Sequence, residues 1–199
     1  MNDIAKRTFD LALSSVGLLL ASPLLVLVAI AIRMKLGSPV FFVQRRSGAG
    51  GIPFDMIKFR TMTNAVDAMG NLLPNSERMT TFGNFLRKTS LDELPELWNV
   101  LRGEMSLVGP RPLLPEYDKL YSDEHAKRLT VRPGLTGLAQ VNGRSASSWS
   151  ERFDHDVHYV ENQSLWLDIK ILFSTVRAVI VKDGVTTPDL NKRFDGYGE

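Results

Sequence analysis

The chain has 199 residues, with 24 Lys and Arg against 22 Asp and Glu, and a formal net charge of +2. This length fits one domain with a small appendage, and so mild a charge argues against a nucleic-acid partner, which usually requires a concentrated basic face. The absence of cysteine excludes disulfides and thiolate metal sites.

An uncharged, apolar run extends from Leu11 to Ile32 and is long enough to cross a bilayer as a helix. Pro23 stands in its middle, directly after Ser22. A proline inside a helix removes the hydrogen bond to the carbonyl four residues earlier, here that of Leu19, and bends the helix. In lipid, the Ser22 hydroxyl can satisfy the freed backbone. We therefore predict a membrane break at Ser22–Pro23.

Positive charges flank this run on both sides: Lys6 and Arg7 precede it, and Arg33 and Lys35 follow it. The positive-inside rule assigns both flanks to the cytoplasmic side. A re-entrant helical hairpin, which enters and leaves the membrane through one face, satisfies both flanks, so we predict such an anchor over residues 1–36. The alternatives are a kinked single span and a signal peptide, although the latter would need a small-residue cleavage site.

Two short strands are expected between residues 39 and 62. The second alternates in its later half, which places Lys58 and Arg60 on one face. Two cations on one strand face are consistent with anion binding, and a solvated face explains them equally well. The glycine-rich stretch 47–51 lies between the strands. Because no P-loop Lys-Ser/Thr follows it, a hairpin loop is favoured over a phosphate cradle.

The centre of the chain carries an adjacent pair of acids, Asp92 and Glu93, within the stretch 87–103. Pro95 lacks an N–H and suits only the first turn of a helix. The two carboxylates are therefore expected at a helix N-terminus, where phosphates or a metal–phosphate complex also bind. The alternative is structural, because Ser90 to Glu93 also fits a capping box.

Cations stand on both sides of this pair. A helix predicted over residues 76–88 brings Arg87 to its C-terminal end. An apolar strand over 105–108 precedes Arg111, which lies between two prolines that restrict its backbone. The alternatives for Arg111 are a side chain held in a fixed position and an exposed residue in a simple turn. Gly103 is the expected C-cap of the helix after the acid pair.

Three further helices are predicted. A polar one covers residues 115–129, and apolar spacings of four and three mark another over 149–160. The latter carries Asp154 and Asp156 in a D-x-D pattern, which many nucleotide-sugar glycosyltransferases use to hold a metal. Those enzymes rest on a sizeable α/β domain, and the sequence lacks the necessary alternation of strands and helices.

The last predicted helix covers Leu165–Val181. Its apolar face is broader than an ordinary surface stripe, and Trp166 is typical of a membrane interface. A buried core helix is the alternative. Asp168 lies within the apolar part and would need a partner.

Together these segments resemble the bacterial sugar transferase family, in the small form of the monotopic phosphoglycosyl transferases. The stretches that carry the resemblance are Lys58–Met62, Arg87–Leu97, Gly103–Pro112, Arg132–Arg144, Ser22–Pro23 and Asp168–Leu172. Because these stretches are spread from one end of the sequence to the other, the likeness extends over nearly the whole chain. The implied fold is α+β and mostly helical: the re-entrant anchor is followed by a small catalytic domain, residues 37–199, with short strands and interfacial amphipathic helices.

The resemblance also implies a reaction. Family members take a sugar 1-phosphate from a nucleotide diphosphate sugar, here a UDP-sugar, and transfer it to undecaprenyl phosphate with the help of Mg²⁺. By similarity, Asp92 is the nucleophile that forms a covalent phosphosugar and expels UMP. Glu93 is a metal ligand or a proton acceptor, and the ligands of Mg²⁺ include Asp92 or Glu93. Such a transfer is the first membrane step of glycan assembly.

By the same resemblance, five cations are candidate phosphate contacts: Lys58, Arg60, Arg87, Arg111 and Arg144. Asp156 and Asp168 are candidate carboxylates that hold the site residues in position without contacting the substrate themselves. The expected location is the cytoplasmic face of the cell inner membrane, with membrane lipid and downstream glycosyltransferases as further partners. Two other functions stay open: a D-x-D glycosyltransferase that releases UDP, and a membrane-bound adaptor without chemistry.

Overall fold

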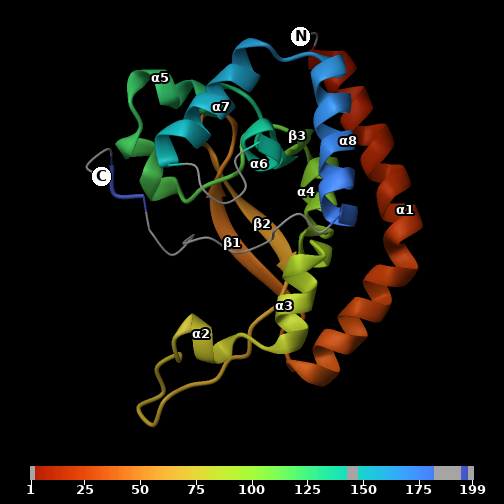
Figure 1. The fold of residues 1–199 in the computed structure, drawn as a ribbon. Coiled ribbons are helices and arrows are strands. Elements are labelled where there is room, and N and C mark those ends of the chain that lie inside the picture. Colours follow the sequence, from red (N-terminus) through yellow and green to blue (C-terminus); the bar gives the residue numbers. More distant parts are fainter. Residues whose placement is uncertain (1–2, 143–147, 182–193, 197–199) are drawn as a thin grey trace.

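Helix α1 (Asp3–Lys35) is the longest element of the computed structural model, which describes residues 3–142, 148–181 and 194–196. It continues through Pro23 and bends about its middle along one side of the molecule (Figure 1). The Ser22 hydroxyl donates to the Leu19 carbonyl at 2.7 Å, which is the acceptor that Pro23 leaves free. The membrane break is therefore a bend in one continuous helix, and two separate helices of a hairpin are not seen.

Helix α1 is long and apolar enough to cross a membrane, with a mean hydropathy of 2.6 in a stretch of which only 11% is buried. Leu19 and Leu20 in its middle are 74% and 75% exposed. Both ends of the helix nevertheless contact the rest of the molecule. Lys6 and Asp10 are buried near its start, and three apolar side chains near its end pack against β2 and α3: Val28, Ile32 and Leu36.

Strands β1 (Phe41–Ser47) and β2 (Pro53–Phe59) form an antiparallel hairpin, and the glycine-rich stretch between them is the predicted loop, with the 3₁₀ turn η1 (Ala49–Gly51). In this register Phe42 lies opposite Lys58, and Arg46 lies opposite Phe54. Because side chains alternate along a strand, Arg46 and Lys58 share one face of the hairpin.

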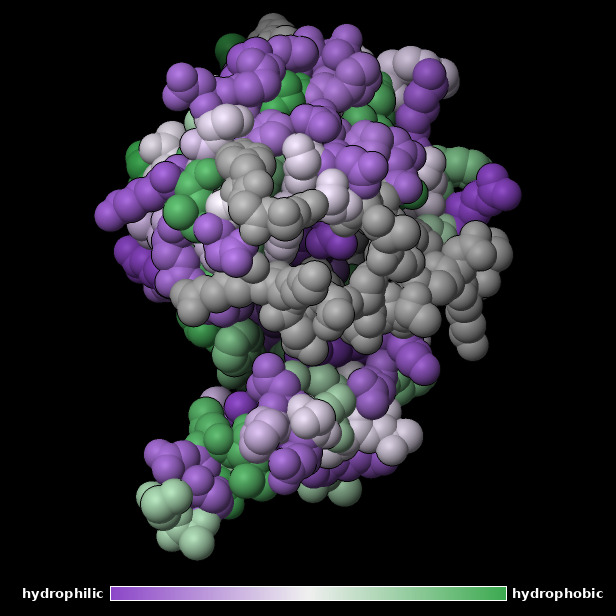
Figure 2. Space-filling model, turned by 60° about the vertical axis from the view of Figure 1, so that its left-hand side comes forward, coloured by the Kyte–Doolittle hydropathy of each residue, from purple (hydrophilic) through white to green (hydrophobic). Residues whose placement is uncertain are grey.

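Residues 62–79 form an arm that stands away from the rest of the molecule (Figure 2). The predicted helix over 76–88 begins within this arm and is broken in two, α2 (Asn75–Arg78) and α3 (Thr81–Lys88). The break has a local cause. The Thr80 hydroxyl accepts a hydrogen bond from the Gly83 N–H at 3.0 Å, so Thr80 is the N-cap of a new helix.

Helix α4 (Glu96–Arg102) ends at Gly103, whose φ of 84° makes it the predicted C-cap. Strand β3 (Ser106–Val108) follows and pairs in parallel with β4 (Gly134–Thr136). Neither β4 nor α6 (Leu138–Asn142) was expected within the glycine-rich loop.

The polar helix predicted over 115–129 is instead three short elements: η3 (Pro115–Leu120), α5 (Asp123–Ala126) and η4 (Lys127–Thr130). The two later helices agree with the prediction, as α7 (Trp149–Glu161) and α8 (Leu165–Val181). Helix α8 runs beside α1 (Figure 1). It buries Ile171 and exposes a row of apolar side chains, which consists of Trp166, Ile169, Phe173, Val176 and Val179.

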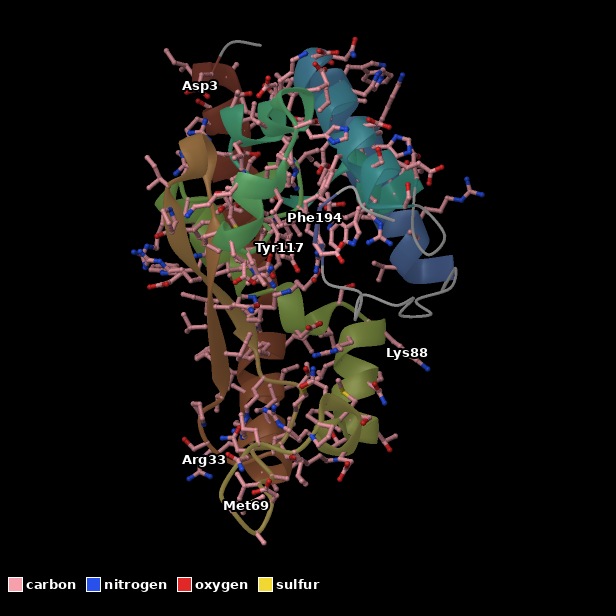
Figure 3. The ribbon with its side chains drawn as sticks, turned by 90° about the vertical axis from the view of Figure 1, so that its left-hand side faces the viewer. Asp3, Arg33, Met69, Lys88, Tyr117 and Phe194 are labelled. Atoms are coloured by element: carbon pink, nitrogen blue, oxygen red, sulfur yellow. The ribbon has the colours of Figure 1, made fainter. Side chains whose placement is uncertain are left out.

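The main core joins the hairpin, α4, β3, α7 and α8; its buried members are Phe54, Met56, Leu97, Val100, Met105, Leu107, Val108, Tyr159 and Ile171. A second cluster joins the end of α1 to Phe59 and Leu86. A third is aromatic, and in it Tyr117 and Phe194 face one another edge to face with centroids 5.7 Å apart (Figure 3). These clusters fix β2, α4 and β3 against one another, and the candidate site lies where they meet.

Candidate active site

The acid pair lies on a 3₁₀ turn, η2 (Leu91–Glu93), between α3 and α4. Pro95 was expected in the first turn of a helix and is the N-cap of α4, one position earlier, so the acid pair lies just ahead of the helix N-terminus. The difference is small, because Leu94 and Pro95 both have helical backbone angles and continue the turn into α4. A tight turn thus presents both carboxylates just ahead of α4.

The capping-box interpretation is not supported by the geometry. The Ser90 side chain makes no capping hydrogen bond, and its backbone is left-handed, with φ 54° and ψ 18°. This conformation is uncommon for a residue with a Cβ, costs of the order of 1 kcal/mol, and is concentrated at functional sites. The carboxylate of Glu93 is directed to two cations and not to the Ser90 N–H.

Glu93 joins two cations that arrive from different parts of the chain. Its Oε1 lies 3.2 Å from the Lys58 ammonium of β2 and 2.8 Å from the Arg111 guanidinium, which follows β3. Burial alone would raise the pKa of Glu93, but Arg111 and Lys58 overcome that effect and lower it to about 2. Glu93 is therefore a permanent anion that holds the two cations in place.

Asp92 differs from its neighbour in both its contacts and its charge. It is only 8% exposed, and burial together with the negative charge of Glu93 raises the pKa of Asp92 to about 6, against the opposing effect of Lys58 and Arg87. Among the described residues, no side chain donates a hydrogen bond to its carboxylate. Asp92 is thus a carboxylate that, among the described residues, no side chain holds by a hydrogen bond, although several cations lie near it.

Glu96 is a third carboxyl group of the site, and the sequence analysis did not identify it. Its Oε1 lies 3.2 Å from the Lys58 ammonium, which Glu96 therefore shares with Glu93. Burial raises the pKa of Glu96 to about 7. The available signal was its spacing, because a residue three positions after Glu93 lies on the same side of a helical turn.

The backbone of Arg111 is held in position by a buried ion pair between Arg128 and Asp156. The Arg128 guanidinium donates to the Arg111 carbonyl oxygen at 2.6 Å and to Asp156 at 2.9 Å. It also donates to the Tyr121 hydroxyl at 3.0 Å. Arg128 and Asp156 are both less than 5% exposed. In the part of the chain that the structure describes, Asp156 is linked to the site through Arg128; its supporting role stays a prediction.

The other predicted cations are placed differently. Arg87 donates from Nε to the Thr61 hydroxyl at 3.0 Å and lies near enough to Asp92 to influence its pKa. Arg60 is buried, and its guanidinium donates to the carbonyls of Leu36 and Ser38. Arg60 therefore fastens the end of α1 to β2, and we exclude it from the proposed phosphate contacts. Arg144 lies outside the described residues.

The carboxylate of Asp168 has the partner that its position requires. Its Oδ2 lies 2.7 Å from the Lys6 ammonium, and its Oδ1 accepts from the Tyr159 hydroxyl at 2.7 Å. The Lys6 ammonium and the Tyr159 hydroxyl also reach the Val108 carbonyl, at 3.2 and 3.0 Å. Asp168 therefore joins α1, α7 and α8 at the strand that leads to Arg111.

The two acids of the D-x-D pattern have separate partners. Asp154 is exposed and lies 2.8 Å from the His125 ring, whereas Asp156 is buried against Arg128. Within the described part of the chain, no group of three or more His, Cys, Asp or Glu side chains is arranged to hold a metal ion. The pattern does not form a shared metal site here.

A Mg²⁺ site does not require three or more protein side chains as ligands. This ion usually binds through one or two carboxylates and completes its shell with water and substrate phosphates. Among the described residues no side chain occupies the Asp92 carboxylate, and Glu93 uses only Oε1 for its cations. The donor set at the acid pair therefore fits Mg²⁺ that is bound together with a phosphorylated substrate.

These features point to a class of protein: one with a long apolar helix able to cross a membrane and a buried carboxylate within a cluster of cations suited to phosphate. Comparison with known proteins specifies the class. The bacterial sugar transferase family model matches residues 1–182. The chain belongs to the bacterial sugar transferase family.

Three relatives illustrate the match. An uncharacterized sugar transferase of Bacillus subtilis, EpsL, is 51% identical over 199 residues that cover 98% of both chains. A UDP-glucose:undecaprenyl-phosphate glucose-1-phosphate transferase of Caulobacter vibrioides is 41% identical over 191 residues, 91% of this chain and 72% of the relative. An undecaprenyl-phosphate galactose phosphotransferase of Salmonella typhimurium is 40% identical over 196 residues, 90% of this chain and 41% of the relative.

Proposed function

We propose that this protein transfers a sugar 1-phosphate from a UDP-sugar to undecaprenyl phosphate in two steps, with Asp92 as the nucleophile. The observation that carries the proposal is the contrast between the two acids. Glu93 is fixed between Lys58 and Arg111, whereas among the described residues no side chain holds the Asp92 carboxylate, which lies at the same cluster of cations. The names of the Caulobacter and Salmonella relatives, which act on undecaprenyl phosphate, support the substrate class.

In the first step an Asp92 oxygen forms a bond to the β-phosphorus of the donor. The bond from that phosphorus to the bridging oxygen breaks, and its electron pair leaves with UMP. In the second step a phosphate oxygen of undecaprenyl phosphate attacks the same phosphorus, and the Asp92 carboxylate is released. Dividing the transfer in this way lets one site serve a soluble donor and a lipid acceptor in turn.

The cations have a clear role in these steps. Lys58, Arg87 and Arg111 would bind the phosphate oxygens and reduce the repulsion between an anionic nucleophile and an anionic donor. Mg²⁺, held at Asp92 or Glu93, would screen the diphosphate and stabilise the charge of the departing phosphate. Arg128 and Asp156 would keep Arg111 in position through its backbone carbonyl.

The covalent step predicts a directly observable product. After brief incubation with Mg²⁺ and UDP-glucose or UDP-galactose, without lipid acceptor, the intact protein is expected to gain the mass of one sugar phosphate as UMP appears in equal amount. Added undecaprenyl phosphate is expected to remove the adduct. A donor that turns over without an adduct and yields UDP would contradict the covalent mechanism and favour the D-x-D alternative.

We further propose that α1 enters and leaves the membrane through the cytoplasmic face. Its start and its end both pack against the same small body of elements, whereas a helix that spans about 30 Å of hydrocarbon places its ends on opposite sides. The exposed apolar row on α8, with Lys170 beside Trp166, would rest on the same membrane surface.

Cysteine labelling tests this topology, because the chain contains no cysteine of its own. Single cysteines at Ile4 and Met34, both highly exposed near the two ends of α1, are expected to react with a membrane-impermeant maleimide in inside-out vesicles only. Leu20→Cys is expected to be protected until detergent is added. Labelling of the two ends from opposite sides of the membrane would refute the one-face arrangement.

A further inference from the structure

Arg46 lies on the same face of the hairpin as Lys58 and takes no part in the two steps described above. The register of β1 and β2 puts Arg46, Gln44 and Lys58 on one face. The neighbouring Arg45 lies on the opposite face, where it is exposed and pairs with Asp55 at 3.2 Å. Because successive side chains of a strand point to opposite faces, these two adjacent arginines lie on opposite sides of the hairpin.

The guanidinium of Arg46 lacks the partner that a buried cation normally has. It donates one hydrogen bond, from Nη2 to the neutral amide oxygen of Gln44 at 2.7 Å. Its Nε is buried without a hydrogen-bond partner, and among the described residues no carboxylate lies within 4.0 Å of it. Because a partly buried charge without a counterion is costly, this arrangement suggests that an anionic ligand completes the site.

The charges around Arg46 support the same conclusion. Burial lowers the pKa of Arg46, and the nearby positive charge of Arg111 lowers it further. Glu96 and Tyr117 oppose this effect, but Glu96 shares its charge with Lys58. Arg46 therefore lies within electrostatic reach of Arg111. Glu93 pairs with Arg111, but among the described residues no carboxylate pairs with Arg46, and a phosphate bound by both guanidinium groups would supply that charge.

The position of Arg46 along the strand distinguishes between the two phosphorylated substrates. The start of β1 lies beside α1, since Phe41 stacks on Phe59 in the cluster that includes the end of that helix. Arg46 lies at the other end, where the N–H of Ser47 donates to the Leu113 carbonyl at 2.9 Å. Arg46 is therefore remote from the C-terminal end of α1. The lipid acceptor would lie beside that membrane helix, so the position of Arg46 suits a soluble nucleotide better than a lipid.

We propose that Arg46 binds, together with Arg111, the phosphate of the donor that leaves as part of UMP. The inference rests on the proposed function and deepens it. Lys58 and Arg87 would then serve the phosphorus under attack near Asp92, while Arg46 and Arg111 hold the departing phosphate. The arginine pair would give the site its affinity for the nucleotide.

The test compares Arg46→Gln with Arg45→Gln in the full-length protein in detergent. Binding of UMP with Mg²⁺, and separately of a short-chain polyprenyl phosphate, is measured by calorimetry. Loss of a charge-assisted contact in a partly buried site is expected to raise the dissociation constant for UMP about ten- to a hundredfold in Arg46→Gln. Binding of the polyprenyl phosphate, and both affinities in Arg45→Gln, are expected to change less than about threefold.

A melting curve separates binding from structure. Removal of an uncompensated cation is expected to leave the melting temperature of Arg46→Gln unchanged or higher. Normal UMP affinity, weakened binding of the polyprenyl phosphate alone, or a large drop in melting temperature would each overturn the assignment of Arg46. If the wild-type protein itself binds no UMP, the proposed function fails, and this inference fails with it.

Discussion

Replacement of Asp92 by Asn is expected to reduce sugar-phosphate transfer by a factor of about 10³ or more, because an amide cannot replace the attacking carboxylate. The covalent adduct should disappear together with turnover. Asn is similar in size and shape, so the cations around the site should keep their places. The measurement is release of UMP from UDP-glucose or UDP-galactose, with the intact mass of the protein as a second readout.

The same substitution is expected to stabilise the fold. Folding raises the pKa of the Asp92 carboxyl from its ordinary 3.8 to about 6, so the folded state binds more protons than the unfolded state between these values. Stability therefore falls as the pH rises through about 4 to 6. At pH 7 the charged form costs about 1–3 kcal/mol relative to a neutral one, and the uncharged amide of Asp92→Asn avoids this cost. Thermal unfolding at pH 7 and pH 4 should show the gain at pH 7 only.

A matched control comes from the D-x-D pattern. Asp154→Asn removes an exposed carboxylate that faces the His125 ring, and this variant is expected to retain most of the activity. Loss of activity in Asp154→Asn with full activity in Asp92→Asn would favour the D-x-D glycosyltransferase. If neither substitution changes any measured property, the adaptor function is favoured.

Local patterns predicted several features well because their causes are local. The bend at Pro23, the hairpin loop, the C-cap at Gly103 and the bounds of α8 each follow from residues that are neighbours in the sequence. Thr80 shows the limit of this approach: its hydroxyl starts a new helix, whereas the apolar spacing alone favoured a single one. The pairing of β3 with β4 depends on residues almost thirty positions apart and left no local signal.

The candidate site was predictable to the extent that its residues occur in recognisable stretches. Asp92, Glu93 and Arg111 were identified in this way, and the fold brings them together. Arg60 was assigned to the face of Lys58 by alternation, but β2 ends at Phe59, so the alternation does not extend to it. Arg46 and Glu96 were not predicted, because their placement depends on the fold: the strand register puts Arg46 on the same face of the hairpin as Lys58, and the turn into α4 brings Glu96 into contact with Lys58.

Replacement of Lys6 by Met is expected to destabilise the protein by about 3–5 kcal/mol. The Lys6 ammonium lies 2.7 Å from Asp168 and 3.4 Å from Asp10, and all three side chains are almost completely buried. Without this cation two carboxylates remain close together in a place that water does not reach. Because Lys6 also contacts the Val108 carbonyl, just before Gly109-Pro110-Arg111, transfer activity should fall as well. Chemical unfolding in detergent measures the loss of stability.

Lys127→Met is the matched control for this prediction. The Lys127 ammonium also contacts two carboxylates, those of Glu124 at 2.7 Å and Glu161 at 2.9 Å, but all three side chains are largely exposed. Since water solvates the remaining charges, the expected cost is below about 1 kcal/mol. The distances in the two clusters are similar, so burial alone accounts for the expected difference. If Lys6→Met and Lys127→Met lower the free energy of unfolding equally, the contacts of Lys6 do not attach α1 to the catalytic elements.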